Sequence, residues 1–88
     1  MNKDTVQTLN RLKAELENID TFRVEDRLLV QQLQNDIEHL LAKSAPSVDE
    51  HRSLHARLQE AIRRMEVSHP DVTEVMSEVV NSLSNMGL

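Results

Sequence analysis

Hydrophobic residues recur every three or four positions along most of the chain, with polar residues between them. The first such stripe consists of Val6, Leu9, Leu12, Leu16 and Ile19. This spacing places the side chains on one face of an α-helix. Asp4, followed three residues later by Gln7, resembles a capping box, in which two side chains satisfy unpaired backbone donors at a helix start. The pattern therefore predicts an amphipathic helix over residues 4–19.

A second stripe follows a short polar break at residues 20–23. Its members are Leu28, Leu29, Leu33, Ile37, Leu40 and Leu41. Glu25 and Asp26 stand near its start and Lys43 near its end, where acidic and basic side chains respectively interact favourably with the helix dipole. These features predict a second helix over residues 24–43.

A third helix is expected after the Ser-Ala-Pro-Ser segment at residues 44–47, which is the clearest loop in the chain. Ser47 and Glu50 have the spacing of a capping box. The stripe that follows consists of Leu54, Leu58, Ile62 and Met65. We therefore expect this helix over residues 48–67.

The dipeptide His69-Pro70 interrupts a run that otherwise reads as helix. Proline in a helix interior costs about 3 kcal/mol, whereas at the first turn its missing N–H would be unpaired anyway. Ser68 or His69 can cap a new helix there, which we expect over residues 70–86. Gly87 then suits the left-handed position just past a helix end, with Leu88 folding back on the last turn.

A continuous, kinked helix is the alternative. The positions Leu58, Ile62, Met65, His69, Val72, Met76, Val79, Leu83 and Met86 alternate spacings of four and three straight through Pro70. Such a heptad phase is typical of a coiled coil. In either case we expect an all-α bundle in a single domain, residues 1–88, with four amphipathic helices or two long kinked ones. Ser68, His69 and Pro70 then form a hinge or a cap.

The composition suggests that this bundle is completed by self-association. The chain has 88 residues and one aromatic residue, Phe22, so its core must be aliphatic. Small chains with modest cores often share their apolar faces with a second copy. The expected interaction stripe consists of Leu54, Leu58, Ile62, Met65, Val72, Met76, Val79 and Leu83. We expect a homo-oligomer, with a dimer favoured.

The charge distribution argues against nucleic acids and membranes as partners. Ten basic and fifteen acidic residues give a net charge of −5. The one basic cluster is Arg52, Arg57, Arg63 and Arg64. Glu60 and Glu66 interrupt it, which is typical of a solvated helix face rather than a phosphate-binding surface. No apolar run approaches the about 20 residues needed to span a bilayer, and the first residues lack the apolar core of a signal peptide. We expect a cytoplasmic protein.

Residues for catalysis are scarce. The chain has no cysteine, which excludes disulfides, thiolate metal sites and cysteine nucleophiles. The serines belong to no nucleophile elbow, and there is no glycine-rich phosphate loop. His51 and His55, four apart on one helix face, can hold a metal ion if a third ligand comes from elsewhere, although Arg52 beside them opposes a cation. We expect no enzyme and no cofactor, with metal or small-ligand binding through these two histidines as the alternative function.

The segment "MEVSHPDVTEVMSEVVNSLSNMGL", residues 65–88, resembles the C-terminal signature of a small bacterial family of unknown function, domain family forty-four zero four. That signature is Phe-Glu-x-x-His-Pro and a final Gly-Ile. Its positions fall here on Met65, Glu66, His69, Pro70, Gly87 and Leu88. The first and last of these differ from the signature but remain apolar. "VEDRLLVQQLQNDIEHLL", residues 24–41, resembles the family's Glu-Asp-Arg followed by a leucine-rich helix. The resemblance implies a bacterial source and a helical fold, and no activity or site.

Together these observations predict a small non-catalytic protein that acts through protein–protein interaction or self-association.

Overall fold

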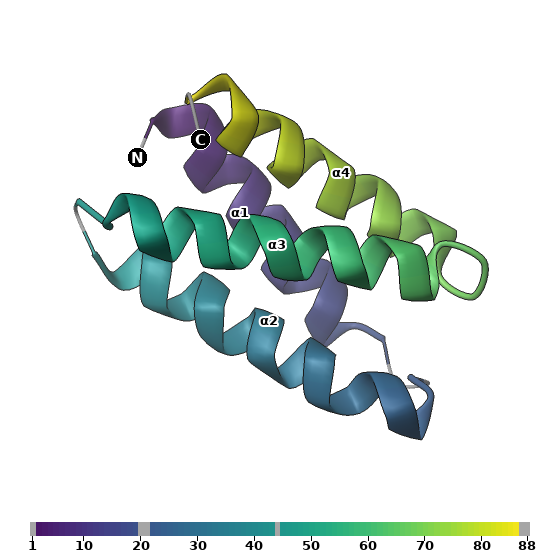
Figure 1. Ribbon diagram of the computed structural model, residues 1–88. Coiled ribbons are helices and arrows are strands. Elements are labelled where there is room, and N and C mark those ends of the chain that lie inside the picture. Colours follow the sequence, from purple (N-terminus) through teal and green to yellow (C-terminus); the bar gives the residue numbers. More distant parts are fainter. Residues whose placement is uncertain (1, 20–21, 44, 87–88) are drawn as a thin grey trace.

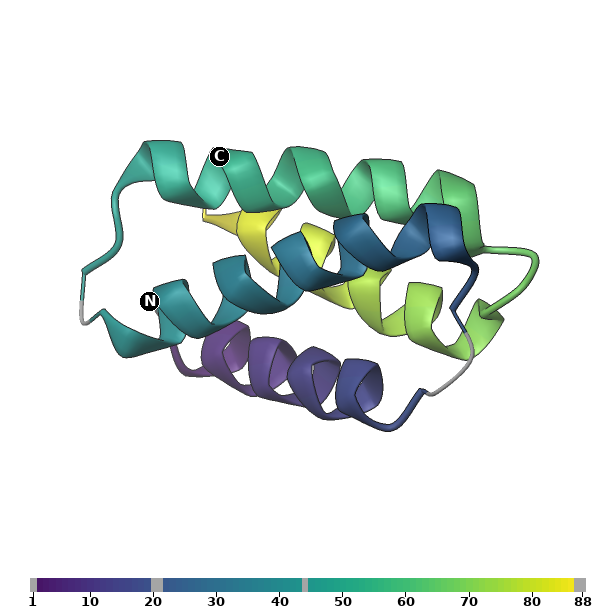
Figure 2. The same cartoon turned by 90° about the horizontal axis from the view of Figure 1, so that it is seen from below.

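The computed structural model describes residues 2–19, 22–43 and 45–86, and within them the chain forms four α-helices. These are α1 (Lys3–Glu17), α2 (Val24–Ala42), α3 (Val48–Met65) and α4 (Pro70–Asn85) (Figure 1). Each helix begins and ends within two residues of its predicted bounds. Consecutive helices pack against one another, and α1 also packs against α4, which closes a ring. Figure 2 shows α1 and α3 on opposite sides of this ring. The predicted all-α bundle is confirmed.

The core of the bundle is aliphatic and is supplied by all four helices. It consists of Leu9, Leu12, Leu16, Leu29, Val30, Leu33, Ile37, Leu40, Leu54, Leu58, Ala61, Met65, Val72, Val75, Met76, Val79 and Leu83. Phe22, the single aromatic residue, is only partly buried at its edge. The apolar stripes of the four helices face one another and are therefore buried without large aromatic side chains.

The residues predicted to bind a second copy lie mostly inside this core. Of the eight residues in the expected interaction stripe, seven are buried within one chain, and Ile62 is partly buried against them. Apolar stripes left uncovered by a single chain were the reason to expect self-association. That reason fails, because the chain's own helices cover these side chains. Leu28, expected on the apolar stripe of the second helix, is instead 65% exposed on the outer face of α2.

The start of α1 differs from the predicted capping box of Asp4 and Gln7. Asn2 is the N-cap residue, and its Oδ1 accepts a hydrogen bond of 2.8 Å from the Thr5 N–H. Because the helix begins one residue earlier than expected, Asp4 already lies within its first turn. There the carboxylate can act only through the helix dipole.

The break at Pro70 is a corner between two helices, and the continuous kinked helix is wrong. Helix α3 ends at Met65, and Pro70 is the first residue of α4. His69 occupies the N-cap position, but its side chain does not cap the helix. Its ring instead lies 3.1 Å from the Ser68 hydroxyl and stacks at a tilt on Phe22, with centroids 4.9 Å apart. The loop before α4 is thus held to the loop before α2. The predicted C-terminal motif of Gly87 and Leu88 lies outside the described residues.

The predicted capping box of α3 is confirmed, and it belongs to a larger network. The Glu50 N–H donates to Ser47 Oγ (3.2 Å), and the Ser47 N–H donates to Glu50 Oε1 (3.1 Å). The ammonium of Lys43, at the end of α2, donates to Glu50 Oε2 (2.8 Å). The hydrogen bond from Lys43, and then that from Ser47, lowers the pKa of Glu50 from 4.5 to about 2. Glu50 therefore joins two helix ends as an ionised group.

This pKa implies a specific dependence of stability on pH. A carboxyl whose pKa is lower in the folded than in the unfolded chain stabilises the fold above its unfolded pKa. That contribution is lost as the pH falls from about 4.5 to about 2. We expect Glu50→Gln, which can keep the capping hydrogen bond, to lower the free energy of unfolding at neutral pH, and the difference from wild type to shrink through this window.

Urea unfolding at a series of pH values measures this difference. Asp49→Asn is the matched control, because Asp49 is exposed in the same helical turn and forms no ion pair with any residue described by the structure. A difference between wild type and Glu50→Gln that stays constant from neutral pH to about pH 2 would contradict the role of Lys43 and Ser47 in holding the carboxylate.

Candidate functional site

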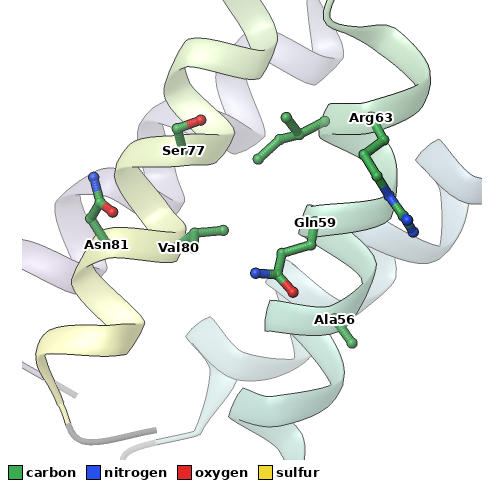
Figure 3. A pocket seen from close by; sticks show the side chains of 7 residues that line it. Ala56, Gln59, Arg63, Ser77, Val80 and Asn81 are labelled. Atoms are coloured by element: carbon green, nitrogen blue, oxygen red, sulfur yellow. The ribbon is translucent and has the colours of Figure 1, made fainter.

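An open groove of about 550 Å³ runs between α3 and α4 on the outer surface of the bundle (Figure 3). We call it the α3–α4 groove. Its walls are formed by Ala56, Gln59, Ile62 and Arg63 of α3 and by Ser77, Val80 and Asn81 of α4. The spacings of three and four within each set place these side chains on one face of each helix. The groove is therefore built by two helices that follow each other in the chain and meet at the Pro70 corner.

The α3–α4 groove has an apolar floor and a polar rim. Ile62 and Val80 are partly buried and pack against the core from the outside. The remaining five lining residues are exposed. Figure 3 shows Gln59 and Val80 extending into the space between the two helices, while Arg63 extends away from α4. An apolar floor that faces solvent between polar rims is typical of a binding surface.

The polar groups of the rim are free to bind. Within the described residues, the side chains of Gln59, Ser77 and Asn81 form no hydrogen bond with the protein. Arg63 is the charged residue of the lining, and it has no ion-pair partner in the described part of the chain. Two other arginines of the basic cluster are engaged. Arg57 binds Asp36 on α2 (2.7 Å), and Arg64 lies 3.6 Å from Glu60.

The two histidines proposed as metal ligands have different surroundings. His51 is 6% exposed, its Nδ1–H donates to the Ser47 carbonyl (2.9 Å), and its buried Nε2 has no partner among the described residues. His55 is partly exposed, and its Nε2 lies 3.4 Å from Ser84 Oγ on α4. Across residues 2–19, 22–43 and 45–86, no three histidine, cysteine or acidic side chains gather where a metal ion would fit. Within these residues the structure therefore places no third ligand beside the pair.

The rim residues Gln59, Ser77 and Asn81 belong to no motif, and sequence reasoning missed them. One signal was present, because residues 75–86 contain a single charged residue, Glu78, in a chain with 28% charged residues. Glu78 is engaged by Arg11 of α1 (2.6 Å) on another side of α4. A helix that must be solvated on its outer face would be expected to carry more charge there. Low charge on an exposed helix face is therefore the feature that indicates the groove.

None of the helices in the described residues combines the length and the apolar character required to cross a bilayer.

Within the described residues, the fold and the groove define a small four-helix bundle protein with an open groove that has an apolar floor and a polar rim. The family model described as "Domain of unknown function (DUF4404)" matches residues 6–88, and the chain belongs to this family. No match to a curated protein or to a solved structure was found.

Proposed function

We propose that this protein is non-catalytic and acts by associating with a second copy of itself through the α3–α4 groove. The observation that supports the proposal is the apolar floor of Ile62 and Val80, open to solvent between hydrogen-bonding side chains without partners. Burying such a floor stabilises a complex by about 25 cal/mol for each Å² of apolar surface removed from water. Gln59, Ser77 and Asn81 can pair across the same contact.

Charge favours a second copy at this surface. Each chain carries a net charge of −5, so two copies repel one another when acidic faces meet. Exposed carboxylates occur on α1 and α2, at Glu17, Glu25 and Glu38. The lining of the α3–α4 groove contains no carboxylate. Two copies that meet groove to groove therefore bring no lining carboxylates together, and Arg63 is the one charge that each lining contributes. Charged residues are depleted at interface centres in general.

The same lining argues against catalysis there. General acid–base chemistry needs a histidine or a carboxyl group within hydrogen-bonding reach of the substrate. The lining includes neither. Ser77 is the one hydroxyl, and within the described residues no base forms a hydrogen bond with it, so it is not activated as a nucleophile. Among the described residues no third ligand lies beside His51 and His55, and we do not propose metal binding there.

Analytical ultracentrifugation over a wide concentration series tests the proposal. We expect the wild-type chain to form a dimer as concentration rises. Ala56→Glu, which places a carboxylate on the rim without touching the core, should be monomeric at concentrations where wild type is dimeric. Ala14→Glu, the same change at an exposed position of α1, should dimerise like wild type. Circular dichroism and thermal unfolding establish that both variants are folded.

Two results would overturn the proposal. A wild-type chain that remains monomeric at the highest concentration would remove self-association itself. A folded Ala56→Glu variant that dimerises as strongly as Ala14→Glu would show that the contact lies outside the α3–α4 groove.

A further inference from the structure

We infer that the two copies are related by a two-fold axis parallel to the helices, so that Arg63 of each copy pairs with the partner's Glu74. This inference rests on the proposed function, because it specifies the orientation of the partner in the same groove. It assigns to Arg63 and Glu74 the role of selecting that orientation.

Arg63 lines the α3 wall of the groove, and Glu74 lies just beyond the lining residues of α4, near the same end. Arg63 and Ser77 both line the groove, one from α3 and one from α4. Glu74 precedes Ser77 by three residues, so it lies one turn nearer the start of α4 on the same face. The start of α4 is also the end at which α3 finishes, because a short loop joins the two helices (Figure 1).

Both charged groups lack a partner in the isolated chain. Arg63 and Glu74 are exposed, and neither forms an ion pair within the described residues. Neighbouring charged residues differ in this respect, because Glu78 is held by Arg11, and Arg64 lies close to Glu60. Within the described residues, the loop end of the helix pair thus presents an unpaired cation on α3 and an unpaired anion on α4.

Two copies that meet groove to groove around a two-fold axis can take one of two orientations. With the axis parallel to the helices, α3 of each copy lies over α4 of the other, and the two loop ends coincide. Each Arg63 then faces the partner's Glu74, so the contact forms twice, as a two-fold interface requires. With the axis across the helices, α3 lies over α3, and the loop ends point in opposite directions. Arg63 then faces the half of α3 that carries Ala56 and Arg52. The acidic residues of that half, Asp49 and Glu50, lie in the first turn of the helix, farther from the groove than the cation of Arg52. Glu50 is already held by Lys43.

Charge reversal with mixing tests this orientation. We expect Arg63→Glu and Glu74→Arg each to weaken the dimer by at least about tenfold, because two attractive contacts become two repulsive ones. The double variant, which keeps the wild-type net charge, should recover most of the affinity. An equimolar mixture of the two single variants should form a mixed dimer, because one copy then carries only carboxylates and the other only guanidinium groups at these positions.

Arg52→Glu is the matched control for Arg63→Glu. It makes the same charge change at an exposed position of α3, more than two turns from the loop end. We expect the control to retain wild-type affinity within about twofold. All variants are compared by sedimentation in low and high salt, since salt should weaken the effect of the reversals.

The outcomes separate the two proposals. Restored affinity in both the double variant and the mixture supports the orientation. If wild type dimerises but neither the double variant nor the mixture recovers affinity, the orientation is wrong and the groove contact stands. Single reversals no weaker than Arg52→Glu lead to the same conclusion. A monomeric wild-type chain overturns the proposed function together with the orientation.

Discussion

Leu58→Ala is expected to lower the free energy of unfolding by about 2–5 kcal/mol. Leu58 is fully buried on α3, within a core supplied by all four helices. Removing its isobutyl group loses the transfer free energy of the buried atoms and leaves a cavity that a closed ring of helices can fill only partly. The total stability of domains is about 5–15 kcal/mol, and a chain of 88 residues lies at the lower end, so the variant should be close to unfolded at moderate urea concentrations.

Urea unfolding followed by circular dichroism measures this loss. Leu28→Ala removes the same atoms from a side chain that is 65% exposed on α2, and should change stability by no more than about 0.5 kcal/mol. All proteins must be compared at one concentration, because dimer formation would add stability by mass action. Equal losses for the two leucines would contradict the observed burial of the stripes.

Ala61→Leu is the second large effect that the structure predicts. Ala61 is fully buried on the core face of α3, among leucines and valines. Three additional carbon atoms there must displace neighbouring side chains or separate helices, which typically costs about 1–3 kcal/mol. The loss arises although leucine is a good helix former and more apolar than alanine.

Ala14→Leu is the appropriate comparison, because Ala14 is exposed in the interior of α1. The same atoms added there should alter the free energy of unfolding by no more than about 0.5 kcal/mol. Thermal unfolding of both variants beside wild type gives the two values. A stabilised Ala61→Leu variant would reveal unfilled space at the centre of the bundle.

The helices themselves were predictable because helix formation depends on neighbours in sequence. Spacings of three and four marked each amphipathic segment, and Ser47 with Glu50 marked the start of α3. Pro70 also acted locally, through its missing N–H, and it separated α3 from α4 as expected. The error at Asn2 arose because several polar residues near the chain start can serve as a cap, and their spacing does not rank them.

The α3–α4 groove was not predictable in the same way. Whether Ile62 and Val80 face the core or a gap depends on how closely α3 and α4 approach. That approach is set by contacts between residues far apart in the chain, including those of α4 with α1. The same applies to Leu28, which was predicted on the apolar stripe of the second helix but is exposed on the outer side of α2. The sequence offered only the low charge of residues 75–86 as a sign of the groove.

By itself, the sequence determined an all-helical chain with amphipathic stripes, an interruption at Pro70 and no cysteine chemistry, because periodicity, capping and composition are properties of short segments. Only the tertiary structure decided that Pro70 forms a corner, that one chain covers nearly all of these stripes, that His51 is buried, and that an apolar floor remains open between α3 and α4. The physical reason is that a side chain is buried only when the face of one helix packs against the face of another. The spacing of apolar residues shows which side of a helix is apolar. Which helix covers that side depends on residues that are distant in the sequence.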